Sequence, residues 1–302
     1  MKVIVTGATG FVGQNLLPYL SGKGYKVSSL ALRTENWQLE ADATAIIHLA
    51  GKAHDTKNTA AASVYFEVNR DLTIALFKRF LASPIRDFFY FSSVKAVADT
   101  VEGTLHEEVA GKPYTPYGQS KFEAEQYLLA QSLPAGKRLF IIRPCMIHGP
   151  GNKGNLNLLY KVVQKGIPWP LAAFDNARSF LYVDNLCWLI EQMLQHTELT
   201  SGVYNFADDD AVSTNELVHI IAEAIGKKAR LWKINAGMMR SVAALGDKLK
   251  LPLNSERLKK LTESYVVSNQ KIKTALHIKS LPFTAKQGLK NTISVFDAIP
   301  GK

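Results

Sequence analysis

The sequence predicts an α/β fold in which a doubly wound parallel sheet carries a second, smaller lobe. Short runs of β-branched and aromatic residues, typical of buried parallel strands, alternate with longer segments whose apolar residues recur at helical spacing. The first of these runs ends at spaced glycines that lead directly into a helical pattern. With 302 residues, 47% of them hydrophobic, the chain can bury a full core.

The predicted elements alternate regularly as far as residue 144. Strands are expected at residues 2–6, 26–33, 45–51, 88–93 and 138–144, and helices at 15–20, 64–81 and 117–132. Beyond the Gly- and Pro-rich loop at 148–155 the order is less regular, with a helix starting within 178–185, a short strand at 204–206 and a capping box at 213–216. We therefore expect a sheet domain over residues 1–150 and a smaller mixed α/β lobe, interleaved with it, over residues 151–302.

The formal charge of +10 is concentrated at the C-terminal end of the chain. Residues 227–302 contain 16 Lys and Arg against 4 Asp and Glu, which gives +12, whereas the first 226 residues contain 20 against 22, which gives −2. Such a basic region attracts polyanions, and nucleic acid, a nucleotide diphosphate and an anionic membrane surface are all candidates. Most of these lysines are nevertheless expected to form an ordinary solvated face.

Several classes of protein and site are disfavoured by the composition. No apolar stretch approaches the ~18 residues that a membrane-spanning helix needs, and the N-terminus lacks the features of a signal peptide. The two cysteines, Cys145 and Cys187, lie in apolar surroundings, so we expect buried thiols in a reducing cytoplasm and no metal site.

The glycines after the first strand predict a dinucleotide site. Residues 6–13 are T-G-A-T-G-F-V-G, so the glycines are spaced by three and three, one insertion away from the G-x-G-x-x-G pattern. Glycines here allow a tight turn, let backbone N–H groups approach a pyrophosphate and aim a helix N-terminus at its charge. The residues expected to contact the cofactor are Gly7, Thr9, Gly10, Phe11, Val12 and Gly13.

The end of the second strand favours NADP over NAD. An acidic residue near this position binds the ribose hydroxyls of NAD, whereas an arginine suits the 2′-phosphate of NADP. The chain has Ala31 and Arg33 here and no carboxylate before Glu35. The alternative is that Arg33 simply faces solvent.

The next two strands end in small or hydroxylated residues. Leu49, Ala50 and Gly51 follow the third strand and would let the cofactor lie against the backbone, while His48 is expected to be a satisfied core residue. Ser92 and Ser93 end the fourth strand. Because ligands of open parallel sheets bind beyond the carboxyl ends of the strands, these two serines are candidates to bind a substrate oxygen.

Tyr117 and Lys121, four positions apart, predict a proton-transfer pair. Residues at i and i+4 share one face of a helix, so the phenol and the ammonium can converge. A nearby cation favours the phenolate of a tyrosine whose ordinary pKa is about 10. Taken alone, the spacing is also that of an ordinary surface pair.

Taken together, the ordered motifs resemble those of extended short-chain dehydrogenases/reductases. Within them the chain is similar to the NAD(P)-dependent epimerase/dehydratase family that acts on nucleotide sugars. The residues that carry the resemblance are Thr6 through Gly13, His48 through Gly51, Asn69, Tyr117 through Lys121, Arg143 and Pro144, His148 through Gly151, and Arg178 through Asn185.

The resemblance implies a role for each matching position. Tyr117 would be the catalytic acid/base, Lys121 its partner and a nicotinamide-ribose ligand, and Asn69 and Pro144 further cofactor contacts. The candidates for substrate binding are Lys95, Asn155, Arg178 and, less directly, Arg257. Residues 1–150 would then bind the dinucleotide on a Rossmann sheet, and residues 151–302 the substrate.

One position departs from the family pattern. A third hydroxyl usually follows the position of Ser93 and assists the tyrosine, but here that residue is Val94. Ser93, Ser92, Lys95 or a water would have to replace it, or activity would be reduced. The sequence Ser-Ser-Val-Lys resembles the version in bacterial enzymes that reduce 4-keto-6-deoxy-N-acetylhexosamine nucleotides and in some UDP-hexose 4-epimerases.

Three functions remain open at this stage. The favoured one is an NADPH-linked reductase of a UDP-4-keto-6-deoxy-hexosamine. The second is a UDP-glucose or UDP-N-acetylhexosamine 4-epimerase with retained NAD. The third is a catalytically weak regulatory or RNA-associated protein, although intact Tyr117 and Lys121 make nucleic acid an unlikely partner. By resemblance we also expect a cytoplasmic homodimer that pairs the Tyr117 helix and the helix around residues 72–81 of each subunit.

Overall fold

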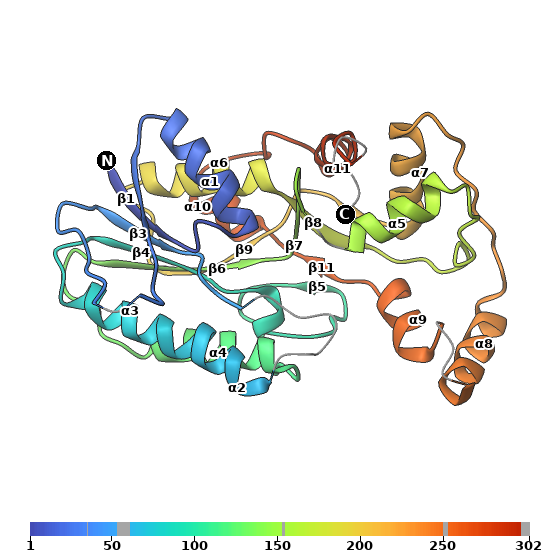
Figure 1. Ribbon diagram of the computed structural model, residues 1–302, viewed down its shortest axis with the longest axis horizontal. Coiled ribbons are helices and arrows are strands. Elements are labelled where there is room, and N and C mark those ends of the chain that lie inside the picture. Colours follow the sequence, from blue (N-terminus) through green and yellow to red (C-terminus); the bar gives the residue numbers. More distant parts are fainter. Residues whose placement is uncertain (35, 53–60, 153–154, 250–252, 297–302) are drawn as a thin grey trace.

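Six parallel strands form the central sheet of the computed structural model, which describes residues 1–34, 36–52, 61–152, 155–249 and 253–296 (Figure 1). Their order is β2-β1-β3-β4-β6-β9, and every neighbouring pair is parallel. The strands are β1 (Lys2–Thr6), β2 (Lys26–Leu30), β3 (Ala45–His48), β4 (Asp87–Phe91), β6 (Arg138–Pro144) and β9 (Gly202–Phe206). The predicted doubly wound parallel sheet is confirmed.

The chain reverses direction across the sheet at β1. It runs from β1 to β2 on one side and returns to β3 on the other side, so that β1 lies between its two successors. In open parallel sheets such a switch point opens a crevice at the carboxyl ends of the strands, where ligands bind. The residues after β1 and β3 therefore meet at one place.

Helices cover both faces of the sheet (Figure 1). One face carries α1 (Phe11–Gly22), α6 (Val183–Gln195) and α10 (Gln270–Ala275); the other carries α2 (Ala62–Phe66), the π-helix η1 (Glu67–Asp71), α3 (Leu72–Leu81) and α4 (Pro116–Leu129). Alternate strand residues point to opposite faces, so Val3 packs with Leu16 of α1, whereas Ile4 packs with Phe77 of α3. Each face thus has its own buried core.

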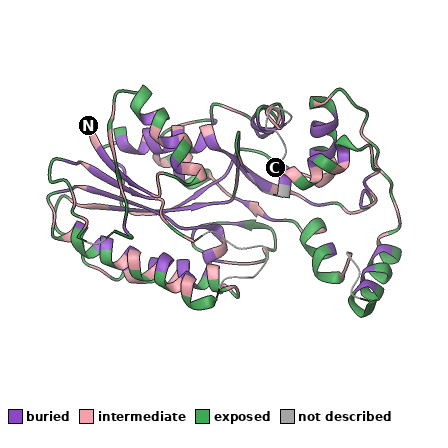
Figure 2. Cartoon of the chain, in the orientation of Figure 1, coloured by how far each residue is buried: buried purple, intermediate pink, exposed green. Residues whose placement is uncertain are grey.

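The smaller lobe has its own sheet and its own core. The 3₁₀ turn η2 (Val94–Ala96) follows β4. A three-stranded sheet has the order β10 (Ala211–Val212), β8 (Arg178–Tyr182), β7 (Met146–His148). A two-stranded sheet pairs β11 (Val266–Val267) with β5 (Thr104–Leu105). Its helices are α5 (Asn155–Gln164), α7 (Thr214–Ala224), α8 (Ala236–Leu249), α9 (Ser255–Thr262) and α11 (Ala285–Ile293). Figure 2 shows the sheets buried and α8 and α9 largely exposed.

One expected element differs in the structure. Residues 178–182 form strand β8, and the helix expected from residue 178 begins only at Val183. The reason is that Ser179–Tyr182 is buried between β7 and β10, which complete its hydrogen bonds. Asp184 does lie in the first turn of α6, as expected. Helix α6 and strand β9 follow residue 150 in the chain but lie with the large sheet. The domain boundary proposed at residue 150 therefore stays a prediction.

Other expectations are confirmed. Of the expected capping box, the serine half is present: the Ser213 side chain accepts a hydrogen bond from the Glu216 amide at 3.0 Å and caps α7. Cys145 and Cys187 are buried free thiols. Among the helices of the described residues, none is long and apolar enough to cross a bilayer.

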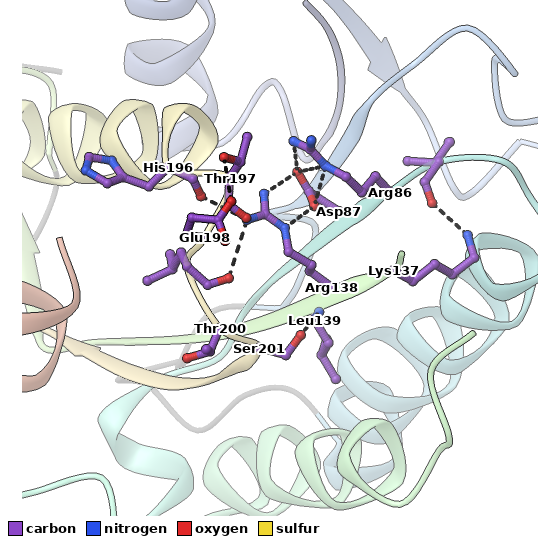
Figure 3. Close-up of polar contacts among 12 residues, drawn as sticks. Arg86, Asp87, Lys137, Arg138, Leu139, His196, Thr197, Glu198, Thr200 and Ser201 are labelled. Carbon is purple, nitrogen blue, oxygen red and sulfur yellow. Dashed lines mark hydrogen bonds and ion pairs between the residues drawn. The ribbon is translucent and has the colours of Figure 1, made fainter. Parts of the chain in front are cut away.

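A buried charge cluster closes the amino edge of the sheet (Figure 3). Asp87, which is fully buried at the start of β4, accepts hydrogen bonds from Arg138 Nε at 2.7 Å and from Arg86 Nη2 at 2.9 Å. Arg138 also donates to the carbonyls of His196 and Thr197, at 2.9 and 2.7 Å, just after α6 ends. The cluster therefore links β4, β6 and α6.

Lys137 completes this edge from the adjacent position. Its ammonium donates to the carbonyls of Phe80, Ser83 and Ile85 at 2.9, 2.8 and 2.6 Å. These carbonyls lie at and after the C-terminal end of α3, where a cation is favoured by the helix dipole. At the amino edge, charges are matched by acceptors or opposite charges.

Candidate active site

The glycine turn after β1 brings three backbone segments into close contact. Gly7 has φ of +71°, and a Cβ there would lie 2.6 Å from the Ala50 amide nitrogen. A Cβ at Gly13 would lie 2.5 Å from the Gly7 carbonyl oxygen. Both positions therefore require glycine, because the turn packs directly against α1 and the end of β3.

The N-terminus of α1 is open to an anion. Its N-cap, Gly10, makes no side-chain capping bond, and the first turn holds no acidic residue. A Cβ at Gly10 would meet only the Gly7 carbonyl, at 3.3 Å, so the space beyond it is open to a ligand. The free amides and the helix dipole fit the pyrophosphate of a dinucleotide. Thr9 is exposed in the turn, and Phe11 and Val12 open the helix.

The residues after β3 lie beside this turn. The Ala50 amide donates to Thr6 Oγ1 at 3.1 Å, and the Leu49 amide donates to the Thr6 carbonyl at 3.3 Å. A Cβ at Gly51 would lie 3.0 Å from Asn69 Oδ1 and 3.1 Å from Lys121 Nζ. The backbone at Gly51 is thus held against two of the predicted cofactor residues.

His48 is a satisfied core residue, as expected. Its Nδ1 lies 2.7 Å from Thr6 Oγ1 and its Nε2 lies 2.8 Å from Thr73 Oγ1. Burial, together with the nearby Lys121 ammonium, lowers the pKa of His48 to about 3. The ring is therefore neutral and positions the end of β3.

Asn69 lies in the π-helix η1, where the widened turn carries its side chain toward the site. Its Oδ1 accepts from the Lys52 amide at 2.7 Å, and its Nδ2 donates to Ser120 Oγ at 3.0 Å. Ser120 in turn donates to the Tyr117 carbonyl at 2.8 Å. Asn69 thus ties the segment after β3 to the first turn of α4.

Lys121 is a buried cation at the centre of the site, 4% exposed. Its Nζ donates to the Phe91 carbonyl at 2.8 Å and lies 4.9 Å from the centre of the Tyr90 ring. Burial lowers the pKa of Lys121 to about 8, although the carboxylate of Glu125 acts in the opposite direction. An additional acceptor would stabilise its charge, as a ligand hydroxyl can.

Tyr117 lies in the first turn of α4. The helix begins with a favourable N-terminus, because Thr115 Oγ1 accepts a hydrogen bond from the Gly118 amide at 3.2 Å and Pro116 occupies the first helical position. The Tyr117 ring is partly buried and meets the Tyr65 ring edge-on, with centroids 6.3 Å apart. Its hydroxyl lies near the Ser93 side chain, which acts to lower the pKa of Tyr117.

The pKa of Tyr117 corrects one expectation. Burial raises this pKa, and the nearby Ser93 side chain offsets only part of the rise. The phenol of the chain alone is therefore protonated at neutral pH, not held as a phenolate by Lys121. The physical reason is that desolvation of the ring dominates, while the Lys121 ammonium is bound to the Phe91 carbonyl.

The hydroxyls at the end of β4 have different surroundings. Ser93 faces Tyr117, and its Oγ also accepts from the Lys95 amide at 3.2 Å, which caps η2. Ser92 Oγ is buried and has no hydrogen-bond partner among the described residues. Val94, 4% exposed, packs into the core below. Of the candidates to replace the family's third hydroxyl, Ser93 is the one that lies near Tyr117.

Lys95 and Arg178 form a second cationic group at this edge. Lys95 Nζ donates to the Asp99 carbonyl at 2.7 Å and lies 4.3 Å from the Tyr265 ring centre. Arg178 pairs with Glu263, with 3.5 Å between Nη2 and Oε1. Burial lowers the pKa of both basic groups, and the charge of Arg178 lowers that of Lys95 further. An anion bound nearby would relieve this cost.

The remaining predicted residues lie as follows. Arg33 is exposed in the turn that follows β2, since the strand ends at Leu30 instead of 33. Pro144 ends β6 opposite Phe206 of β9, at the same edge of the sheet. Arg257 is exposed on α9. Asn155 begins α5, but its side chain lies outside the described part of the structure.

Tyr265 is a site residue that the sequence did not indicate. Its hydroxyl donates to the Ala98 carbonyl at 2.7 Å and to the Val94 carbonyl at 3.3 Å, and so holds the turn that carries Ser93 and Lys95. No local pattern marks this tyrosine, because its partners lie about 170 residues away in the chain.

Comparisons with known proteins agree with this arrangement. The family model described as "NAD dependent epimerase/dehydratase family" matches residues 3–207. A UDP-glucose 4-epimerase of Vibrio cholerae is 30% identical, covering 98% of this chain and 95% of its own length. A GDP-6-deoxy-D-mannose reductase of Pseudomonas aeruginosa is 26% identical, covering 80% of this chain and 85% of its own length.

Solved structures share the fold. MoeE5 in complex with UDP-glucuronic acid and NAD superposes with a TM-score of 0.75 and 19% sequence identity, covering 99% of both chains. The family match spans the glycine turn, Tyr117 and Lys121, and continues through the last strand of the large sheet. The chain belongs to the NAD-dependent epimerase/dehydratase family, within the extended short-chain dehydrogenases/reductases.

Proposed function

We propose that this protein catalyses NAD(P)-dependent oxidation or reduction at C4 of a nucleotide sugar, and that its main activity is NADPH-linked reduction of a UDP-4-keto-6-deoxy-hexosamine. The observation that carries the proposal is the placement of Tyr117 near Ser93, on the helix that also carries buried Lys121, at the carboxyl edge of the sheet that also holds the open N-terminus of α1. A proton donor therefore stands next to a site suited to a dinucleotide.

Tyr117 is the proposed proton donor. Its pKa is raised by burial, so the hydroxyl carries its proton at neutral pH and can pass it to the C4 oxygen of the substrate. A nicotinamide bound in this site supplies the hydride. Ser93 holds the same oxygen through its hydroxyl, and Lys121 stabilises the negative charge left on Tyr117 while binding the ribose.

The direction of the proton transfer favours the reductase. A protonated phenol suits delivery of a proton to a ketone, whereas oxidation of an alcohol needs the phenolate first. The Ser-Ser-Val-Lys sequence supports the same choice. The 4-epimerase uses both directions in turn and remains the alternative, with a relative of that activity in Vibrio cholerae.

Lys95 and Arg178 are proposed to bind the diphosphate of the substrate, with Asn155 and Arg257 as further contacts from α5 and α9. Burial destabilises the charged forms of Lys95 and Arg178 and so lowers their pKa. The negative charge of a bound phosphate would stabilise these charged forms. The smaller lobe, from about residue 151, would thus supply much of the substrate site. We further propose a homodimer that pairs α3 and α4 of each subunit, the two helices on one face of the sheet.

The reaction itself separates the two activities. The purified protein is incubated with a UDP-4-keto-6-deoxy-N-acetylhexosamine and NADPH, and with UDP-glucose or UDP-N-acetylglucosamine without added cofactor. A reductase consumes one NADPH for each ketone reduced and leaves the second mixture unchanged. Inversion at C4 without added cofactor, accompanied by bound NAD, would establish the epimerase. Neither reaction, together with steeply salt-dependent RNA binding, would overturn both.

The cofactor preference rests on Arg33 and is tested separately. Arg33→Ala removes the charged donor proposed to bind the 2′-phosphate, so the Kd for NADP⁺ should rise about tenfold to a hundredfold while that for NAD⁺ stays unchanged. Lys26→Ala is the matched control, since Lys26 is an exposed cation at the other end of β2. Equal losses for both cofactors would contradict the assignment.

A further inference from the structure

Helix α8 presents an apolar stripe to the outside of the molecule. Met238, Val242, Leu245 and Leu249 are between 44% and 60% exposed. They follow one another at intervals of four, three and four residues, which places them on one face of the helix. Four large exposed apolar side chains in a row are not a random scatter, and such a patch indicates an interaction surface.

This stripe is not the face that packs the helix onto the protein. The buried residues of α8 are Met239, Ala243 and Gly246, each one position beyond a member of the stripe, and they join the core of the lobe together with Leu258 of α9. The helix therefore has two adjoining apolar faces. One holds it in place, and the other has no partner among the described residues.

The two helices form a fixed unit. Asp247 of α8 accepts hydrogen bonds from the amide and the hydroxyl of Ser255, at 3.0 and 2.5 Å, where α9 begins. At Gly246 the helix lies directly against the Leu253 carbonyl, so any larger residue there would clash. Figures 1 and 2 show α8 and α9 at the outer end of the smaller lobe, far from the central sheet and largely exposed.

The unit is strongly basic. Together α8 and α9 hold five basic side chains against two acidic ones, Asp247 and Glu256, and Lys233 just before α8 adds a sixth. The basic residues are Lys233, Arg240, Lys248, Arg257, Lys259 and Lys260. Trp232, 58% exposed, precedes them, and Leu261 of α9 is 39% exposed. Apolar and aromatic side chains beside a cluster of Lys and Arg are typical of helices that lie in the surface of an anionic bilayer.

We propose that α8, supported by α9, binds the surface of an anionic phospholipid membrane. The stripe would enter the boundary between headgroups and acyl chains, and exposed basic residues of the unit such as Lys248 would lie among lipid phosphates, whereas Arg240 packs over the Phe174 ring. At about 1.5 Å per residue, the 14 residues of α8 give a contact about 21 Å long that lies flat on the membrane. The stripe contains none of the proposed catalytic or substrate-binding residues, although Arg257 of α9 is a proposed substrate contact and the charge of Lys260 reaches the proposed substrate site.

Charge favours a membrane over a second copy of the chain. Two copies that met through this stripe would bring two basic units together, and like charges at close range oppose association. A nucleic acid would match the charge but not the apolar side chains. An anionic membrane surface satisfies both features.

Flotation of the full-length protein with lipid vesicles tests the proposal. Vesicles of phosphatidylcholine alone are compared with vesicles containing phosphatidylglycerol. The protein should float with the anionic vesicles and not with the neutral ones, and high salt should release it. Leu245→Ser should lower the partition coefficient at least tenfold, because one buried leucine side chain is lost from the contact. Lys248→Glu should lower it about tenfold.

Matched variants distinguish binding through the stripe from nonspecific adsorption to vesicles. Ile167, which follows α5 and lies outside the proposed dimer helices, is 51% exposed against 52% for Leu245, so Ile167→Ser should leave vesicle binding unchanged. Lys279→Glu, at an exposed lysine outside the unit, should have a smaller effect than Lys248→Glu. Equal losses in the paired variants, or no flotation with anionic vesicles, would refute the proposal. So would loss of a dimer in Leu245→Ser without any lipid, measured by sedimentation equilibrium.

Discussion

At the amino edge of the central sheet, Asp87 binds two arginines and Lys137 binds three backbone carbonyls. At the carboxyl edge, Lys121 and Lys95 each donate to one backbone carbonyl, and Ser92 Oγ lacks a partner among the described residues. Burial lowers the pKa of all three lysines. Both edges bury polar groups, but the charges of the amino edge, drawn in Figure 3, have more hydrogen-bond partners among the described residues.

The difference separates stability from function. A buried charge with complete partners holds elements together, whereas a buried charge or hydroxyl with incomplete partners costs free energy until a ligand supplies the rest. Substitutions at the amino edge should therefore change unfolding and spare turnover. Substitutions at the carboxyl edge should lower turnover, and replacement of Lys121 should also remove the free-energy cost of its buried charge.

Tyr117→Phe should show the largest effect. It removes the proposed proton donor and should lower kcat about 10²-fold to 10⁴-fold, with little change in cofactor affinity or unfolding free energy. Tyr114→Phe is the control, because Tyr114 lies three residues earlier and is 78% exposed. Near-normal turnover in Tyr117→Phe would remove Tyr117 from the mechanism.

Asp87→Ala should be the most damaging change at the opposite edge. It leaves Arg138, whose side chain is only 12% exposed, without its carboxylate, and loss of one partner of a buried pair costs about 3–5 kcal/mol of unfolding free energy. Urea unfolding measures this loss, while kcat of the folded fraction should not change. Asp42→Ala, which breaks an exposed pair with Lys2, should have no resolvable effect. If Asp87→Ala lowered kcat but left the unfolding free energy unchanged, the proposed difference between the two edges would be wrong.

In the protein without dinucleotide, Lys121 should make the unfolding free energy depend on pH. Its pKa falls from the ordinary 10.5 to about 8 on folding, so between these values the unfolded chain binds more protons than the folded one. Stability must then rise with pH from about 8 to 10.5. Relative to Lys121→Met, the rise should reach about 3 kcal/mol in urea unfolding. Parallel curves for the two proteins would contradict the buried, strained cation.

Ser93→Ala should have a smaller effect, on rate and on pH profile together. Loss of one hydrogen bond to the reacting oxygen should lower kcat about tenfold to a hundredfold. Because the Ser93 side chain lowers the pKa of Tyr117, its loss should also move the phenolate-dependent limb of the oxidative reaction to higher pH. Ser92→Ala, which removes a hydroxyl without a partner, is the control. If Ser92→Ala has the larger effect, the two serines exchange roles.

Much of the fold could be predicted because local sequence decides it. The strand expected at residues 138–144 begins and ends where β6 does, and the capping serine of α7 was apparent from the sequence. Residues 178–182 were misassigned because a short apolar run fits either a strand or a buried helix. The segment is a strand because it pairs with β7 and β10, and these strands come from other parts of the chain.

The site was predictable in its parts but not in its electrostatics. Spacing placed Tyr117 and Lys121 on one helix, yet it could not reveal that the ammonium binds the Phe91 carbonyl or that burial raises the pKa of Tyr117. Nor could it find Tyr265, which reaches the site from another element. Desolvation and long-range contacts are properties of the packed chain, and motifs do not carry them.

The central claim is that Tyr117 transfers the proton at the carboxyl edge, next to a bound nicotinamide. A crystal structure of the protein with NADP⁺ and a UDP-hexosamine tests it most directly. We expect the Tyr117 hydroxyl about 3 Å from the C4 oxygen of the sugar, with Ser93 on the same oxygen. A dinucleotide bound away from the Gly7–Gly13 turn, or a sugar out of reach of Tyr117, would contradict the account.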